Sequence, residues 1–522
     1  MSLVSQARRL GLAVLFAVGA TVRADSPLDV IPADAKIVVL VNNLEKSMQG
    51  SEKFAQAIGQ PAPPSDLSQL TGFMGELGSQ WKVNRGVGIA VIQPSQDGVV
   101  AVFPVDDGAA ALKAVKAEMK GDVGSFDMFG QTVMGGAKGK HLLVSAGESS
   151  LKAFSGDKSV ASAMTAAQTK LADSSSVFVY VNIQALKPMI EQGVADGDQL
   201  KKVFEKISEK HPQFNAEQMA EAVKKGVQAL SKEAKSLYLG FQIDEKAAVV
   251  RVGVELLPES KARAKFAAYK ATKPDLFATL PPTNFIAAFG IDAAGIANLD
   301  GTQEGPKVQG VSGAVSFDNG AASVMLRVDS PDASTIHMQL KGLIGIGQMM
   351  AQGQAQGKVE FANSEKKVGG SDVSEIVVKI KGGEPKAQEA MKAILGGSDI
   401  VMQHGVVGQA IGLTIGGKSD GFSALQAAGS LGASTNVKAA ASMLPANSVF
   451  ALLVDPIAVF QLAKKAARAA GEESPIATAN VPDKPGFPMA AALSIESDGM
   501  MLHINVPSAS IKEILPIMQQ IN

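Results

Sequence analysis

The chain has 522 residues, of which 49 are basic and 50 acidic, and it contains no cysteine. This balance excludes the strong positive field of a typical nucleic-acid-binding protein, and the lack of cysteine excludes disulfide bonds and thiolate metal sites. Aromatic residues make up 5% of the chain, which disfavours the stacked-ring platforms of sugar-binding and single-strand-binding proteins. The length exceeds what one hydrophobic core organises, so we expect more than one domain.

The N-terminal segment has the layout of a secretory signal peptide. Arg8 and Arg9 precede an apolar run over 10–22, which is shorter than the roughly 20 residues of a membrane-spanning helix. Val22 and Ala24 occupy the −3 and −1 positions of a cleavage site before Asp25. We predict a signal peptide over 1–24 and an exported mature chain with no transmembrane segment; an uncleaved N-terminal anchor is the alternative.

A short unit then recurs four times along the chain. Each copy has a turn-forming opening, an apolar run typical of a strand, an Asn or Asp, and a helical pattern. The copies cover 31–42, 173–182, 280–292 and 444–455, and their last residues are Asn42, Asn182, Asp292 and Asp455. A short polar side chain in that position is predicted to cap the helix that follows.

Each unit is followed by a predicted hairpin and a further helix. The hairpin turns are Asp97-Gly98, Asp244-Glu245-Lys246, Asn319-Gly320 and Asp498-Gly499. An extra strand pair and short helix is predicted over 128–154 and again over 400–428. Residues 201–236 have the pattern of two inserted amphipathic helices, and 348–357 that of a fraying helix end or a flexible loop.

These patterns predict an α+β protein made by tandem duplication, with halves at 25–273 and 274–522. Each half would contain two strand-helix-hairpin-helix units. Hairpins are incompatible with an all-parallel sheet, so we expect antiparallel or mixed sheets with the helices packed on one face.

Residues 412–419 match the G-x-x-x-x-G-K-[ST] pattern of a phosphate-binding loop, and Asp455 resembles the acid of its metal-holding partner strand. The corresponding segment of the first half, 140–150, reads as a strand and turn and has no lysine equivalent to Lys418. We therefore interpret Leu413-Thr414-Ile415 as part of a strand and Asp455 as a helix cap.

The remaining reactive residue types have structural interpretations. The five histidines are scattered along the chain, and none has a partner at helical ligand spacing. They are His141, His211, His337, His404 and His503. The pairs Met349-Met350 and Met500-Met501 are candidate copper ligands, but gap filling in a core is the simpler interpretation. Asp106-Asp107 suits a helix N-terminus. The sequence therefore nominates no catalytic, cofactor-binding or metal-binding residue.

The repeated Leu/Ile-Pro-Ala-Asp/Asn openings, each followed by a short strand in an alanine-rich exported chain, carry a resemblance. The chain resembles exported bacterial proteins of unknown function, of the kind found in planctomycetes and cyanobacteria. The resemblance implies no activity and no site residue.

Two functions are open from the sequence. The first is a non-catalytic envelope protein that binds a protein partner or an apolar ligand between its two halves. The second is an exported hydrolase whose Ser, His and Asp lie far apart in the sequence and meet only in the fold. A Ser-His-Asp group within hydrogen-bond reach in a cleft would favour the hydrolase, and an apolar groove would favour the binding protein.

Overall fold

The computed structural model describes residues 26–62, 67–195, 205, 215–272, 275–300, 307–318, 320–354, 358–382, 385–416, 421–426 and 429–521. The chain divides into two compact units. The first comprises Met1–Ala264 with Asp498–Met501, and the second Lys265–Ser497 with Leu502–Asn522. The predicted signal peptide, 1–24, and the predicted boundary at 273/274 lie outside the described residues, so both stay predictions.

The predicted fold of small strand-helix-hairpin-helix units with helices on one face is wrong. Within each unit, hydrogen bonds link the described strands into one large sheet, and every pairing given by its register is antiparallel. Strands joined by hairpins pair with neighbours from distant parts of the sequence, and local patterns do not encode those pairings.

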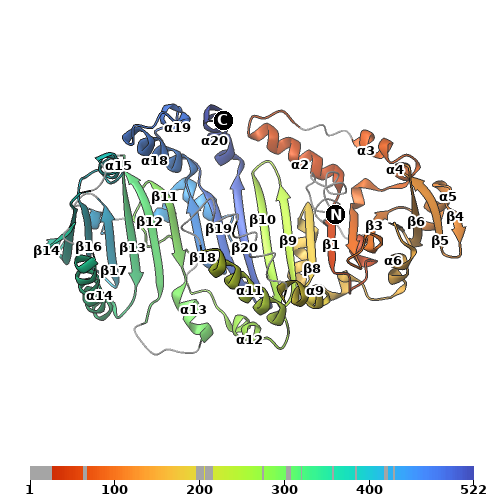
Figure 1. Cartoon of the computed structure of the whole chain (residues 1–522), viewed down its shortest axis with the longest axis horizontal. Helices are drawn as coiled ribbons and strands as arrows, with labels where there is room; N and C mark the ends of the chain where they lie inside the picture. The colour runs from red at the N-terminus through yellow and green to blue at the C-terminus, as the bar shows by residue number, and fades with distance from the viewer. Residues whose placement is uncertain are drawn as a thin grey trace. The chain divides into compact units, whose positions relative to one another are not determined.

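The first unit contains ten strands in the order β4-β5-β6-β7-β3-β2-β1-β8-β9-β10 (Figure 1). Their bounds are β1 Ile37–Val41, β2 Val87–Val91, β3 Val99–Pro104, β4 Glu118–Lys120, β5 Val123–Met128, β6 Gln131–Lys138, β7 His141–Ser145, β8 Val177–Asn182, β9 Ala234–Ile243 and β10 Ala247–Leu256. The run over 140–150 is thus confirmed as a strand and turn, formed by β7.

The second unit has the order β14-β15-β16-β17-β13-β12-β11-β18-β19-β20. Strand for strand, this is the order found in the first unit. The bounds are β11 Phe285–Ile291, β12 Gly310–Asp318, β13 Ala321–Asp329, β14 Val359–Val368, β15 Ser371–Ile380, β16 Ile400–Val407, β17 Ala410–Gly416, β18 Ser448–Val454, β19 Met489–Glu496 and β20 Gly499–Pro507.

The described α-helices connect these strands. Up to α12 they are α2 Leu44–Ala57, α3 Leu67–Phe73, α4 Glu76–Gln80, α5 Gly108–Ala114, α6 Glu148–Lys152, α7 Val160–Ala163, α8 Ala166–Ser174, α9 Ile183–Ala195, α11 Ala216–Glu233 and α12 Lys261–Ala268. The others are α13 Ala293–Asp300, α14 Ala333–Gln354, α15 Pro385–Leu395, α16 Gly421–Ala424, α17 Thr435–Ala441, α18 Pro456–Ala469, α19 Pro475–Thr478 and α20 Ser508–Ile521. No helix within the described ranges is both long and apolar enough to cross a bilayer.

Helices cover both faces of the sheet because some strands are apolar on both sides. Strand β7 is buried along its whole length. Leu142 and Val144 pack in one core cluster with Leu112 of α5, whereas Leu143 packs in another with Leu151 of α6. Successive strand residues point to opposite faces, so α5 and α6 cover opposite sides of β7.

The second unit shows the same arrangement at β16. Gln403 accepts a hydrogen bond from the backbone N–H of Phe422 in α16, at 2.8 Å, while the adjacent His404 contacts α14. Adjacent side chains of one strand thus meet helices on opposite faces. A strand whose side chains are buried on both faces requires cover on both sides, which is why the expectation of helices on one face fails.

Three of the four predicted helix caps are confirmed. The side-chain oxygens of Asn182, Asp292 and Asp455 accept hydrogen bonds from the first turns of α9, α13 and α18. The cap predicted for Asn42 is wrong, because its side-chain amide donates to the carbonyl of Ser175, and the next residue, Asn43, caps α2 through the N–H of Lys46. The first of the four junctions therefore has its cap one residue later.

Candidate functional site

The outer side of α14 is the most unusual surface in the described part of the chain. It carries five large apolar side chains that are 52% to 67% exposed: Met338, Leu343, Ile346, Met349 and Met350. With 3.6 residues per turn, these positions fall on one side of the helix. Large apolar side chains are normally exposed singly, so a group of five on one helix face is a candidate interaction surface. We call these five residues the α14 outer face.

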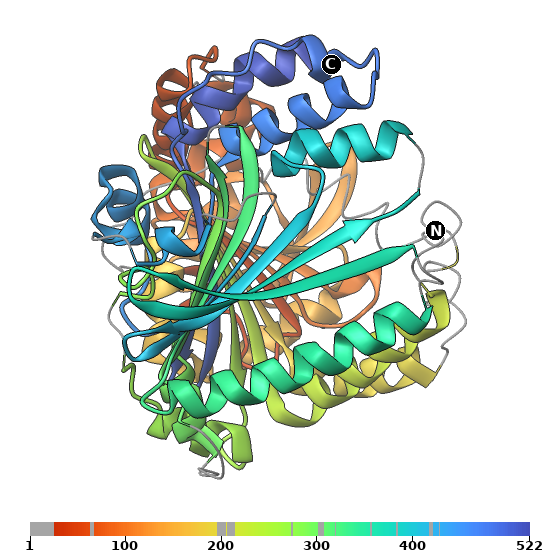
Figure 2. The same cartoon turned by 90° about the vertical axis from the view of Figure 1, so that its left-hand side faces the viewer.

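The opposite side of α14 is held to the sheet by polar contacts. Figure 2 shows α14 lying along one face of the strands of the second unit. Three side-chain pairs join it to β14 and β16: His337 with His404 at 2.9 Å, Lys341 with Glu365 at 2.8 Å, and Gln348 with Asn363 at 3.0 Å. Of the helix's described side chains only Ala333 is buried. The half-buried Ile336, Leu340 and Ile344 lie next to these polar groups, so polar pairs and apolar packing together hold the inner side of the helix. Five further large apolar groups remain exposed to solvent.

The pKa values of the two histidines are lowered for a physical reason. Burial, with smaller contributions from the neighbouring His337 and Lys341, lowers the pKa of His404 to about 4. Burial also lowers the pKa of His337. A hydrogen bond between two imidazole rings requires one unprotonated nitrogen, so this contact depends on at least one neutral ring. Protonation of both rings would replace it with like-charge repulsion.

The edge of the sheet beside α14 is protected by charges. Strand β14 carries Glu360, Glu365, Lys366 and Lys367, and among the described strands it pairs with β15 alone. Charged side chains along an edge strand discourage the addition of another strand. The helix face, rather than the strand edge, is therefore the surface available to a partner.

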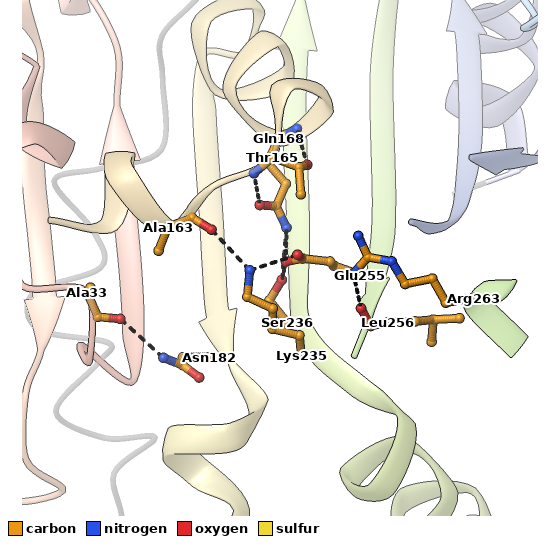
Figure 3. Close-up of polar contacts among 10 residues, drawn as sticks. All are labelled: Ala33, Ala163, Thr165, Gln168, Asn182, Lys235, Ser236, Glu255, Leu256 and Arg263. Atoms are coloured by element: carbon orange, nitrogen blue, oxygen red, sulfur yellow. Dashed lines mark hydrogen bonds and ion pairs between the residues drawn. The ribbon is translucent and has the colours of Figure 1, made fainter. Parts of the chain in front are cut away.

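A second polar group is buried in the first unit. Glu255 on β10 is 2% exposed and accepts hydrogen bonds from Gln168 of α8 at 3.0 Å and from Ser236 and Lys235 of β9 at 2.8 Å each (Figure 3). Burial, followed by the charge of Glu255, raises the pKa of Tyr180. The carboxylate is fully satisfied by its three donors, so this cluster fixes α8 on the strands and leaves no group for a substrate.

One serine lies within hydrogen-bond reach of a histidine, as a hydrolase would require. Ser494 Oγ on β19 is 3.0 Å from His503 Nε2 on β20, and the same hydroxyl contacts Glu496 Oε1 at 3.1 Å. The side chain of Ser494 is 0% exposed. Glu496 contacts the serine hydroxyl itself, and no substrate reaches this buried hydroxyl.

The second unit also contains a cavity of about 330 Å³, at the lower limit of ligand pockets. Leu276, Phe277 and Leu444 form its apolar wall, and Asp275 and Lys438 contribute charges. Asp275 already accepts a hydrogen bond from the N–H of Phe277. Among the residues that the structure describes, no group of three or more potential ligands is arranged to hold a metal.

The sequence-derived candidates are distributed as follows. Leu413-Thr414-Ile415 lies in β17, as predicted, whereas Lys418, Ser419 and His211 fall outside the described residues. Met501 is buried and Met500 half-buried, which confirms that one of this pair faces the core. Met349 and Met350 are exposed on α14, which continues to Gln354. Residues 348–354 are therefore a helix end and not the flexible loop that was the alternative, and 355–357 lie outside the described residues.

Two features missed by the sequence are the histidine contact and the α14 outer face. His337 and His404 are 67 residues apart, and no spacing rule connects them. The α14 sequence is apolar on several sides and rich in glycine, a pattern that predicts a buried or frayed helix. One sequence signal could have indicated the outer face: Met338, Ile346 and Met350 are separated by multiples of four residues, which places them on one side of a helix.

Comparison with known proteins gives no family. No protein-family model matches the chain, and no curated protein matches it. A solved structure described as crystal form I of TP0453 aligns with 48% of this chain and 99% of its own, at 9% sequence identity and a TM-score of 0.19.

Proposed function

We propose that this protein is an exported, non-catalytic binding protein that acts through the α14 outer face. The observation that carries the proposal is the exposure of five large apolar side chains on one side of a 22-residue helix. Leaving such side chains in water forgoes about 1.5 to 3 kcal/mol for each that could be buried, so a covering partner has a substantial driving force. Export is part of the proposal and is supported by the signal-like segment at 1–24.

The alternative, an exported hydrolase, has less support. Its best candidate is Ser494 with His503, and that serine is fully buried. An enzyme needs a nucleophile that a substrate can approach. The α14 outer face needs no rearrangement to meet a partner.

The proposal is tested with an environment-sensitive apolar dye and with the envelope fraction of the source cells. The double variant Leu343→Gln/Ile346→Gln should lose most of the dye fluorescence and most of the co-sedimentation with envelopes that the parent shows. Met518→Gln on α20, which replaces another exposed apolar side chain, is the matched control and should behave as the parent. Equal dye and envelope binding by all three proteins would refute the proposed surface.

A further inference from the structure

We propose that the partner of the α14 outer face is a phospholipid surface, on which α14 lies parallel to the membrane plane. This inference rests on the proposed function. It names the partner by chemistry: acyl chains receive apolar side chains of this face while the polar side of the helix stays on the protein.

The area of the face favours a bilayer over a second protein. A helix of 22 residues is about 33 Å long, and a contact strip about 10 Å wide covers roughly 330 Å². A stable protein–protein interface buries about 800 Å² on each partner. The strip alone therefore falls well short of a stable dimer, whereas a bilayer requires apolar side chains and no matching shape.

Composition favours the same partner. The helix contains no acidic residue, and Lys341 is its one permanently charged side chain. Lipid phosphates thus meet no carboxylate on α14. The helix also lacks Trp, Tyr and Arg, the residues that dominate protein–protein hot spots, and its outer face consists of Met, Leu and Ile. Flexible apolar side chains suit fluid acyl chains.

The attachment of α14 to the sheet gives the helix the orientation that this role requires. His337, Lys341 and Gln348 each contact a polar partner on β14 or β16. An interfacial helix keeps its polar side away from the acyl chains, and here the sheet provides the polar partners. Thr335 and Gln339 are exposed on the same side near the N-terminal end of the helix, so the part of the outer face that enters the acyl region is its C-terminal part, 343–350.

The test is vesicle flotation of the mature chain with phosphatidylcholine vesicles, with and without phosphatidylglycerol. The parent should float with both, and high salt should change its partition by less than about twofold, because apolar burial rather than charge drives binding. Leu343→Gln/Ile346→Gln should lower the partition more than about tenfold, and Met518→Gln should not. In a separate variant, the tryptophan introduced by Ile346→Trp should be quenched by brominated lipid.

Three outcomes overturn the inference: no flotation of the parent, flotation abolished by salt, or equal flotation of the double variant. If the parent fails to float but α14-dependent dye and envelope binding persist, the lipid inference fails and the proposed function stands. If dye binding and envelope binding also do not depend on α14, the lipid inference and the proposed function are both wrong.

Discussion

His337 on α14 and His404 on β16 form a direct hydrogen bond, with 2.9 Å between Nε2 of the first and Nδ1 of the second. The contact joins the N-terminal half of α14 to the sheet. Lys341 and Glu365 are the other charged groups that act on the two rings, and Ser374 is paired with His404 across the strands. Among the described residues, this is where helix attachment depends most directly on protonation.

The histidine contact predicts acid sensitivity. Both folded-state pKa values lie below the usual 6.5, so the folded protein binds fewer protons than the unfolded chain. The stability contribution is complete above pH 6.5 and is lost as pH falls toward 4, by on the order of 2 kcal/mol after allowing for solvent screening.

Urea unfolding at several pH values between 7.5 and 4.5 measures this loss. The double variant His337→Gln/His404→Gln should lose less stability than the parent over that window. The hydrogen bond from Lys341 lowers the pKa of Glu365, so the stability contribution of this carboxylate is lost only at lower pH. Its titration therefore does not affect the comparison of parent and variant in this window. The prediction would be contradicted if the free energy of unfolding fell equally with pH in the parent and the variant.

Removing the side chain of Asp455 should cost more stability than removing an ordinary helix cap. Its carboxylate is buried and accepts bonds from the N–H groups of Ile457, Ala458 and Gly486, and burial raises its pKa. Asp455→Ala should lower the free energy of unfolding by about 2 kcal/mol, at the upper end for a cap. Chemical denaturation measures the loss, and Asp455→Asn should lose less because it keeps one acceptor. A change below about 0.5 kcal/mol would show that these bonds contribute little.

Removing the side chain of Glu255 should cause a large loss of stability. Glu255→Ala leaves the donors of Gln168, Ser236 and Lys235 without their acceptor, and such a loss typically costs about 3 to 5 kcal/mol. The matched control is Glu245→Ala in the exposed β9–β10 turn, which should stay within about 0.5 kcal/mol of the parent. Thermal unfolding of the three proteins compares them, and equal midpoints would refute a structural role for the cluster.

Variants of the α14 outer face that lose binding should still fold normally. Leu343→Gln/Ile346→Gln should change the free energy of unfolding by less than about 1 kcal/mol, because both side chains are already exposed. Leu453→Ala in the buried strand β18 should lose about 2 to 5 kcal/mol in the same urea titration. A severe loss in the double variant would mean that the face is covered in solution.

The signal-like segment predicts that N-terminal sequencing of the exported protein begins at Asp25. Val22 and Ala24 fit the −3 and −1 positions recognised by signal peptidase. Recovery of the chain with Met1 intact in the membrane fraction would show an uncleaved anchor instead.

The sequence alone determined the local features of this protein. Apolar runs such as 449–454 and turns such as Asp244-Glu245-Lys246 fixed strands and hairpins, because alternation and turn chemistry act over a few residues. The caps at Asn182, Asp292 and Asp455 were predictable for the same reason, since a cap needs only the next three residues. The phosphate-loop pattern could be assigned to a strand because a corresponding segment occurs earlier in the chain.

Only the tertiary structure decided how these parts pair and what they expose. The order of strands places β7 beside β3 and β17 beside β13, and these are non-local pairings whose partners the sequence does not name. The contact of His337 with His404 and the outward position of Leu343 and Ile346 have the same origin. Periodicity shows that a helix has an apolar side, but which side meets the sheet depends on the side chains that β14 and β16 present to it.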